Sequence, residues 1–496
     1  MLGSVTSVAI VGVEPRPITV EAHVSNADRE LFSIVGLPDT AVREAKERVR
    51  SALAGSGYRF PRRRVVINLS PADLPKAGAA YDLPIALAVL LADDQMRAPE
   101  GGLVALGELA LDGEVRSVRG GLAAAMVARR LGRQCFLPAG PAAEASVLRG
   151  VDVRSVDCLR NAALGKVEPP DTTTGPIPEP ESRVRSVDSP VHDLAEVRGQ
   201  LLARRALEIA AAGGHHLLLS GPPGAGKTML AQCLPGLLPR LDPEEELEVA
   251  LAWAAAGRRR TDRCVRPFRS PHHSATLAAL VGGGSGVPVP GEVTLANHGV
   301  LFLDELGEFP IHLLDALRQP VEAGAVSIAR KGASVDFPSR FQLVAATNPC
   351  PCGFTGDRLT RCECTERGRK RYRRRLSGPL LDRIDLRVSV ARLMPDEFIG
   401  PRGESTNAVR SRVVAARKRQ RQRGVLNRDL RAVELRDMRW TEAATALLNQ
   451  SVESQALTAR GWNRVRRVAV TVADLAESPT IEEPHVAEAL ALRADL

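Results

Sequence analysis

The sequence has few aromatic residues, no long apolar run and few cysteines, and each shortage excludes a class of protein. Phe, Trp and Tyr make up 3% of the 496 residues, which does not support a wide aromatic platform for stacking single-stranded bases. Apolar stretches of about 18 residues, the length of a membrane span, do not occur. Residues 1–17 have neither a basic n-region nor a cleavage site. We therefore expect a cytoplasmic protein without membrane contacts.

The cysteines and the charge give two further indications. Eight cysteines without an even secretory spacing argue against a disulfide framework, although four of them lie close together. The formal net charge is +9, and the basic excess is concentrated in the C-terminal half. A basic surface of this kind favours an anionic partner.

Residues 221–228, GPPGAGKT, have the pattern of a phosphate-binding loop. The loop follows a short apolar run at 215–220, which predicts a buried parallel strand, and precedes a helix. Glycines allow backbone N–H groups to surround phosphate at a helix N-terminus, Lys227 adds a cation, and the Thr228 hydroxyl is placed for Mg²⁺. The predicted ATP-binding residues are Gly221, Pro222, Pro223, Gly224, Ala225, Gly226, Lys227, Thr228 and Asp304.

Residues 300–305, VLFLDE, predict a second buried strand that ends in two carboxylates. Asp304 is placed toward the metal and Glu305 toward a water molecule, which makes Glu305 the predicted base. The two motifs together indicate a protein that binds and hydrolyses a nucleoside triphosphate with Mg²⁺.

Changes in composition divide the chain into an N-terminal domain (1–165), a linker (166–192), an ATPase core (193–394) and a helical region (395–496). The linker is rich in Pro and poor in apolar residues. After it, Asp193 is a predicted N-cap for a helix that continues to the glycines at 213–214. The last hundred residues have helical periodicity throughout.

Several further motifs are similar to a known family. LVAATNP at 343–349, SGPLLDRID at 377–385, FRSPHHS at 268–274 and GGGSGVPVPGEV at 282–293 resemble the AAA+ ATPases related to magnesium chelatase, most closely the ComM/YifB family. The resemblance covers nearly the whole chain. It implies an αβα P-loop core, a C-terminal helical lid, and assembly into a ring, normally a hexamer.

The resemblance also implies roles for individual residues. Asn348 resembles the sensor that orients the attacking water, and Arg383 resembles the arginine finger that enters a neighbouring subunit. The alternative for Arg383 is an ion pair within its own chain. Arg460 resembles the lid's sensor arginine, with Arg464 close enough to compete, and residues 197–200 resemble the segment that covers the adenine.

Three segments are candidates for DNA contact. Two β-rich runs flank Arg330 and Lys331, which predicts a hairpin that in related helicases points into the ring channel. The segment 282–293 is a channel loop or an ordinary surface loop. Basic runs at 367–375 and 410–423 are suited to phosphate, with solvated charged faces as the alternative. Within the first run the candidates are Arg369, Lys370, Arg371 and Arg373, beside Tyr372, which could stack on a base.

The four clustered cysteines are Cys350, Cys352, Cys362 and Cys364. Two close thiol pairs around a short loop predict one tetrahedral Zn²⁺, and reduced cysteines without metal are the alternative. A structural or DNA-facing role is expected for His272 and His273.

The first 165 residues resemble the proteolytic domain of Lon proteases, which implies an S5-like α/β fold. Ala80 stands at the position of the serine nucleophile, and Ala123 stands at the position of the lysine. Acyl transfer then has neither nucleophile nor base, so we expect a non-proteolytic domain.

The resemblance and the basic segments together favour a ring-forming Mg-ATP-dependent motor that acts on single-stranded or branched DNA. Its expected activity is that of a helicase promoting branch migration when incoming strands recombine during natural transformation. Two alternatives stay open at this point. One is a protein-remodelling ATPase of the magnesium chelatase type, and the other is a regulatory ATPase scaffold.

Overall fold

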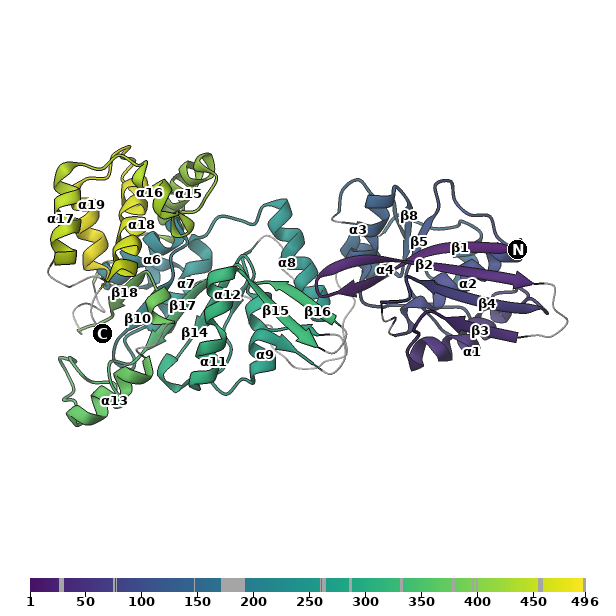
Figure 1. Cartoon of the computed structure of the whole chain (residues 1–496), viewed down its shortest axis with the longest axis horizontal. Coiled ribbons are helices and arrows are strands. Elements are labelled where there is room, and N and C mark those ends of the chain that lie inside the picture. The colour runs from purple at the N-terminus through teal and green to yellow at the C-terminus, as the bar shows by residue number, and fades with distance from the viewer. Residues whose placement is uncertain are drawn as a thin grey trace. The chain divides into compact units, whose positions relative to one another are not determined.

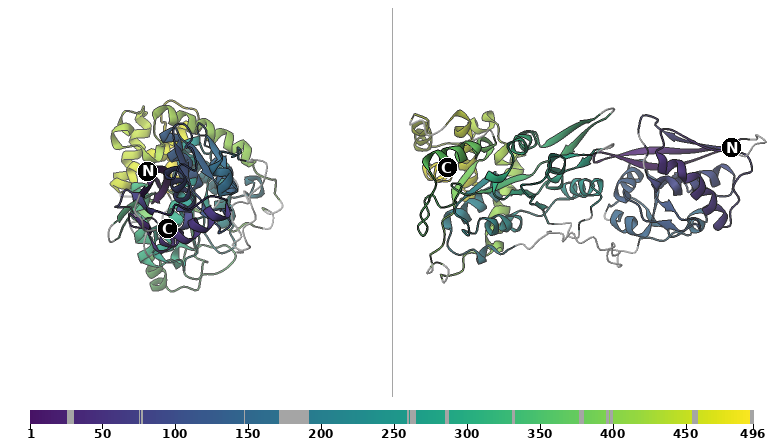
Figure 2. Two further views of the ribbon diagram at one scale, coloured as in Figure 1. Left: turned by 90° about the vertical axis from the view of Figure 1, so that its right-hand side faces the viewer. Right: turned by 90° about the horizontal axis from the view of Figure 1, so that it is seen from below.

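The computed structural model describes residues 1–25, 31–74, 76, 78–146, 148–170, 192–258, 260, 265–284, 288–330, 333–376, 380–394, 397, 400–453 and 458–493. The chain forms two compact units, each built from a β-sheet and helices (Figures 1 and 2). The first comprises Met1–Arg185 and Trp253–Arg259, and the second comprises Ser186–Ala252 and Arg260–Leu496. Most of the linker predicted at 166–192 lies outside the described residues.

The first unit contains a seven-stranded mixed sheet in the order β3-β4-β2-β1-β5-β8-β9. Its elements are β1 (Leu2–Val11), β2 (Glu14–Ser25), β3 (Leu31–Val35), α1 (Thr40–Gly55), β4 (Arg64–Ser70), η1 (Ala79–Tyr81), α2 (Asp82–Ala92), β5 (Leu103–Ala105), β6 (Glu108–Leu109), β7 (Val115–Arg116), α3 (Gly121–Leu131), β8 (Gln134–Leu137), α4 (Ala139–Ala145), β9 (Val153–Ser155) and α5 (Leu159–Ala163). The apolar helix α2 is almost entirely buried, and its first residue Asp82 is paired with Arg48 at 2.6 Å.

The two alanines compared above with a protease's catalytic pair both lie in this unit. Ala80 lies in η1 directly before α2, and Ala123 lies in α3 with 1% of its surface exposed. A methyl group at either position offers no group for acyl transfer.

The second unit contains a five-stranded sheet in the order β11-β14-β17-β10-β18, with every neighbouring pair parallel. Its strands are β10 (Leu217–Ser220), β11 (Phe268–Arg269), β14 (Val300–Leu303), β17 (Gln342–Thr347) and β18 (Leu386–Ser389). Both predicted strands that flank the nucleotide motifs are therefore confirmed. Alternate residues of these strands face two separate cores, which explains why the strands are continuous apolar runs.

Helices cover both faces of this sheet (Figure 1). One core joins the sheet to α6 (Leu201–Gly213), α7 (Lys227–Leu237) and the C-terminal helices. The other joins it to α9 (Leu277–Val281), α10 (Glu292–Leu295), α11 (Ile311–Ala316) and η3 (Leu306–Glu308). The remaining elements are η2 (Leu194–Glu196), α8 (Pro243–Ala255), β12 (Gly282–Gly283), β13 (Val289–Pro290), α12 (Arg318–Ala323), β15 (Ala325–Arg330), β16 (Ala333–Pro338), α13 (Glu366–Leu376), η4 (Leu381–Arg383), α15 (Thr406–Arg423), η5 (Asn427–Asp429), α16 (Ala432–Arg436), α17 (Glu442–Glu453), α18 (Ala459–Leu475) and α19 (Glu483–Ala491).

The prediction of one helix from Asp193 to the glycines at 213–214 is wrong at its start. Asp193 caps only the short η2, where its side chain accepts a hydrogen bond from the Ala195 N–H. Gly199 and Gln200 then have φ values of +56° and +49°. A right-handed helix cannot pass through two left-handed residues, so α6 begins at Leu201.

Candidate functional site

The phosphate-binding loop connects the carboxyl end of β10 to the start of α7. Gly224 and Gly226 have φ values of +77° and +85°, which favour glycine. The Lys227 ammonium group donates to the carbonyl oxygens of Gly221 at 2.6 Å and Pro222 at 2.9 Å, and to Asn348 Oδ1 at 3.1 Å. Burial lowers the pKa of Lys227, while Asp304 and Glu305 oppose this shift. Among the residues that the structure describes, no carboxylate contacts this half-buried cation directly, as expected for a site that binds an anion.

The carboxylates that follow β14 lie beside this loop. Thr228 Oγ1 donates to Asp304 Oδ2 at 2.8 Å, so a hydroxyl and a carboxylate oxygen converge on one point. Oxygen donors of this kind are the ligands that Mg²⁺ prefers. Glu305 has a φ of +51° and its carboxylate is 60% exposed, which turns it away from the core toward solvent.

Topology explains why these residues meet. Parallel strands end at the same edge of a sheet, and β10, β14 and β17 are neighbours in it. The phosphate loop follows β10, the acidic pair follows β14, and Asn348 follows β17. Residues that are more than a hundred positions apart in the chain therefore lie within hydrogen-bond distance.

His273 has a position that sequence reasoning did not indicate. Its Nδ1 lies 3.9 Å from a Glu305 carboxylate oxygen, and its ring lies 4.0 Å from that of His272, centroid to centroid. The segment follows β11, the strand beside β14 in the sheet. Only the strand order could have revealed this pairing, because 31 residues of the chain lie between His273 and Glu305.

Arg383 lies at the opposite edge of the same sheet. It ends η4 and is separated by two residues from the start of β18, which runs parallel to β10. Its guanidinium contacts Glu322 at 2.5 Å, and both residues line a pocket of about 200 Å³ together with Arg460 and Arg464. The structure therefore brings Arg383 and Arg460 together, and it separates both from Lys227.

The two candidate sensor arginines differ in their surroundings. Arg464 Nη1 donates to the Arg383 carbonyl at 2.8 Å and to Asp385 Oδ1 at 3.0 Å. Arg460 is exposed at the pocket wall, and within the described part of the chain no ion-pair partner contacts it. Arg464 thus donates its hydrogen bonds to groups of its own chain, whereas Arg460 is available for a ligand.

Asp385 is a buried carboxylate that joins the sheet to the C-terminal helices. It accepts from the His216 N–H at 3.2 Å and lies 3.5 Å from His215 Nδ1, and His215 Nε2 contacts Thr471 Oγ1 of α18 at 2.7 Å. Burial alone would raise its pKa, but the contacts with His215, His216 and Arg464 lower it well below the ordinary value. Burial lowers the pKa of His216 to about 3, so His216 is neutral at physiological pH.

We expect Asp385→Asn to lower the free energy of unfolding by about 3–5 kcal/mol at pH 7, because it leaves buried partners uncompensated. The folded pKa of Asp385 is below its unfolded value of about 3.9, so its contribution is present above that pH and is lost as pH falls toward the folded pKa. The wild-type urea midpoint, followed by tryptophan fluorescence, should therefore fall more steeply below about pH 4 than that of the variant. Asp382→Asn, an exposed neighbour, is the control, and equal midpoints for both variants would contradict the assignment.

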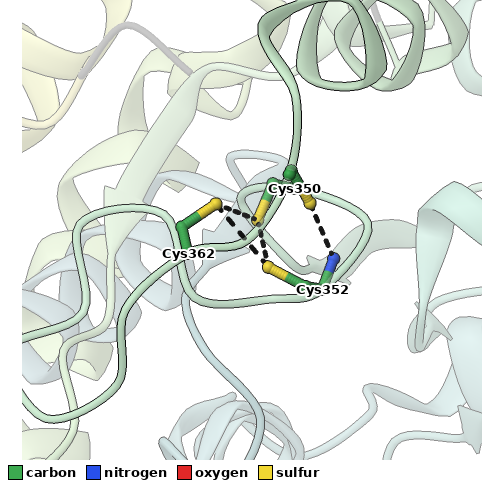
Figure 3. A group of neighbouring side chains, drawn as sticks. Cys350, Cys352 and Cys362 are labelled. Carbon is green, nitrogen blue, oxygen red and sulfur yellow. Dashed lines mark hydrogen bonds between the residues drawn. The ribbon is translucent and has the colours of Figure 1, made fainter.

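The four clustered cysteines converge on one point. Their ligand atoms all lie within 4.8 Å of one another, and Figure 3 shows three of the sulfurs turned toward each other. The Sγ of Cys350 lies 3.4 Å from that of Cys352 and 3.7 Å from that of Cys362. Tetrahedral zinc with Zn–S bonds of about 2.3 Å needs sulfurs about 3.8 Å apart, so the set fits Zn²⁺. Hydrogen bonding, led by the backbone at Phe354, lowers the pKa of Cys352 to about 6.

The basic helix α13 follows the cysteine loop and is fixed by Tyr372. This residue is 8% exposed, its hydroxyl lies 3.2 Å from Thr347 Oγ1, and its ring packs against Gly307. The prediction that Tyr372 could stack on a base is therefore wrong, because its ring is covered by the ATPase core. The basic residues on the other faces of α13 are exposed or half-buried, and they are Arg367, Arg369, Lys370, Arg371, Arg373 and Arg374.

The second basic run, on α15, is largely used within the fold. Arg412 contacts Glu208 at 2.6 Å, Arg417 donates to the Ala211 carbonyl, and Arg423 contacts Asp474 at 2.5 Å. Arg419 donates to the Asp474 carbonyl. Four of the seven cations therefore contact protein groups. The prediction that the whole run forms a phosphate-binding face is wrong for these four residues.

The predicted hairpin is confirmed by the pairing of β15 with β16, in which Arg330 is opposite Ala333. Lys331 lies outside the described residues, as does the Arg330 side chain. The insertion predicted at 282–293 contains the β12–β13 pair, and its residues 285–287 are likewise outside the described part. In the segment compared with an adenine cover, Val197 is 6% exposed and the Gln200 side chain donates to the Ala391 carbonyl.

Among the described residues, no helix has both the length and the apolar character that crossing a membrane requires.

Three family models match the chain. The model of magnesium chelatase, subunit ChlI, matches residues 193–398, that of subunit ChlI of Mg-chelatase matches 20–140, and that of the ChlI C-terminal region matches 403–493. Together these ranges include most of both units.

Individual proteins are similar over nearly the full length. An uncharacterized protein YifB of Escherichia coli is 44% identical, covering 98% of this chain and 96% of the relative. The competence protein ComM of Haemophilus influenzae is 42% identical, covering 99% and 97%. A magnesium-chelatase subunit ChlI of Olisthodiscus luteus is 23% identical, covering 47% of this chain and 72% of that subunit.

Proposed function

The chain belongs to the ComM/YifB family of magnesium chelatase-like AAA+ proteins, and on this premise we propose that it is a ring-forming Mg-ATP-dependent motor that acts on DNA. The family indicates ATPase activity with ATP and Mg²⁺.

The ATPase roles rest on the edge of the sheet where three strands end. Backbone N–H groups of the glycine loop and Lys227 bind the phosphates, and Thr228 and Asp304 hold Mg²⁺. Glu305, exposed beside this point, takes the proton of the attacking water. Asn348 orients that water once the triphosphate draws Lys227 away from its side chain.

Assembly into a ring, of six subunits by analogy, is supported by where Arg383 lies. A four-residue strand separates the two edges of the sheet by about 13 Å, too far for Arg383 to reach the phosphates of its own chain. The nucleotide of a neighbouring subunit can contact Arg383 instead, and Arg460 in the same pocket would contact that nucleotide too. The ion pair with Glu322 would then open on assembly.

DNA as the substrate is supported above all by helix α13. Tyr372 fixes one face of the helix to the ATPase core, and the cations on its remaining faces can meet phosphate without competing for the nucleotide pocket. The β15–β16 hairpin with Arg330 and Lys331 is the second proposed contact. The name of the similar competence protein supports a role related to competence, and we propose branch migration of recombining strands.

The two flanking domains and the cysteine cluster complete the proposal. Residues 1–165 are a Lon-like, S5-type domain without protease activity, and residues 395–496 are the helical lid. Zn²⁺ is held structurally by Cys350, Cys352, Cys362 and Cys364, whose sulfur spacing supports a tetrahedral site.

The test of DNA contact is the salt dependence of binding. Arg371→Ala with Arg373→Ala should weaken binding of a four-way junction and lower the slope of log affinity against log salt by about one per lost phosphate contact. Fluorescence anisotropy over a salt series measures this slope.

Charge-preserving replacement of the same two residues by Lys is the control and should keep the slope. A wild-type protein that binds no DNA at low salt, and whose ATPase rate DNA leaves unchanged, would favour the protein-remodelling alternative instead.

A further inference from the structure

The cysteine loop begins directly at the predicted water-orienting residue. Asn348 is separated from Cys350 by one residue, and its side chain accepts from Lys227 at 3.1 Å. The Cys350 sulfur is buried and accepts a hydrogen bond from the Thr355 N–H at 3.3 Å. The start of the loop is therefore attached both to the phosphate site and to the cysteine cluster.

The same loop packs against the phosphate loop at a second point. Gly353 has a φ of +88°, and a Cβ added there would lie 2.6 Å from Pro223 Cδ and 3.8 Å from Asn348 Cγ. The Gly353 backbone thus packs against the Pro223 ring, with no room for a side chain between them. A displacement of Gly353 would therefore change the packing around both Pro223 and Asn348.

Arg392 strengthens this connection. Its Nε donates to the Pro223 carbonyl at 3.2 Å, and its Nη1 donates to Thr360 Oγ1 at 3.3 Å and lies 3.5 Å from Asp357. Its guanidinium also lies 5.1 Å from the ring centroid of Phe354. One side chain therefore joins the phosphate loop to both halves of the segment between the cysteine pairs.

From these contacts we propose that Zn²⁺ bound by the four cysteines positions Asn348 for ATP hydrolysis, so that occupancy of the metal site sets the rate of turnover. Tetrahedral coordination fixes the sulfurs of Cys350 and Cys352 relative to those of Cys362 and Cys364, and thereby holds Gly353 against Pro223. Binding releases the thiol protons to solvent. The inference rests on the proposed ATPase function, and it assigns the cysteine loop as the group that positions Asn348.

The experiment compares full-length protein as purified, protein treated with a chelator and returned to excess Mg²⁺, and the variant Cys352→Ser with Cys362→Ser. Zinc content should be about one per chain in the first and near zero in the others. Without zinc, kcat should fall about 10- to 100-fold, as expected for a misplaced catalytic group, while the Kd of a fluorescent ATP analogue changes much less. Amide hydrogen exchange at Gly221 and Gly224 should become faster, and restored Zn²⁺ should reverse both effects in the chelated protein.

Gly353→Ala keeps all four thiols and separates metal binding from positioning. It should retain zinc, and Co²⁺ in its place should give the absorption of tetrahedral thiolate coordination, yet kcat should fall as in the zinc-free protein. Cys158→Ser, which removes an unclustered thiol in the other unit, is the control and should match wild type.

Each remaining outcome counts against the inference. Absence of zinc from freshly purified protein, wild-type kcat after zinc removal, or wild-type kcat in Gly353→Ala would overturn it. Zinc-loaded wild-type protein that hydrolyses no ATP would overturn the proposed ATPase function as well, which distinguishes the two failures.

Discussion

Glu305→Gln should bind ATP with nearly unchanged affinity and hydrolyse it about 10²- to 10⁴-fold more slowly than wild type. The amide keeps the size of the side chain but cannot take the proton of the attacking water. Lys227→Ala should instead fail to bind ATP, because the cation that donates to the Gly221 and Pro222 carbonyls of the phosphate loop is removed. Phosphate release and binding of a fluorescent ATP analogue, measured on the same samples, separate the two defects.

The matched control is Glu308→Gln, an exposed carboxylate in η3, three residues from Glu305. It should hydrolyse ATP at the wild-type rate. Wild-type turnover in both Glu305→Gln and Lys227→Ala would contradict the assignment of this edge of the sheet as the ATP site.

Arg383→Ala should reduce ATP hydrolysis about 10³-fold while leaving ATP binding intact. The reason is its position, since it lies at the edge of the sheet that does not bear the phosphate loop. Mixing Arg383→Ala subunits with Glu305→Gln subunits should restore part of the activity. At some interfaces an intact Arg383 from one variant then meets an intact Glu305 from the other.

Glu322→Gln distinguishes the neighbour's site from an ion pair within the chain. If Arg383 serves only to form the ion pair with Glu322, this variant should lose as much ATP hydrolysis as Arg383→Ala does. If Arg383 acts on the neighbouring subunit, Glu322→Gln should keep wild-type hydrolysis. No recovery of activity at any mixing ratio would also count against action between subunits.

Local sequence patterns predicted those parts of the fold that depend on near neighbours in the chain. The strands before the phosphate loop and before Asp304 are apolar runs bounded by polar residues, and both are present. The helix predicted from Asp193 is broken at Gly199 and Gln200. Its apolar spacing continued through that point, whereas the left-handed backbone there depends on contacts with distant residues such as Ala391.

The two basic runs show that local sequence patterns are equally limited in predicting the residues of the candidate site. Two segments with seven cations each look alike in sequence. Yet Arg412, Arg417 and Arg423 contact groups on other elements of the fold. In α13, by contrast, Lys370 pairs only with Glu366 of the same helix among the ion pairs of the described residues, and Arg371 and Arg373 are exposed. Charge patterning shows where cations are in the chain, and only packing decides which of them meet solvent.

The sequence by itself determined the family, the phosphate-binding loop, the acidic pair after its strand and the presence of four clustered thiols. Each of these is a short motif whose chemistry depends on residues adjacent in the chain. The tertiary structure alone decided which residues from distant parts of the chain lie close together in the site. Parallel strand order brings Asn348 to Lys227 and His273 to Glu305, and it places Arg383 at the other edge. Strand order is set by burial of all the strands together, and no local segment of sequence contains that information.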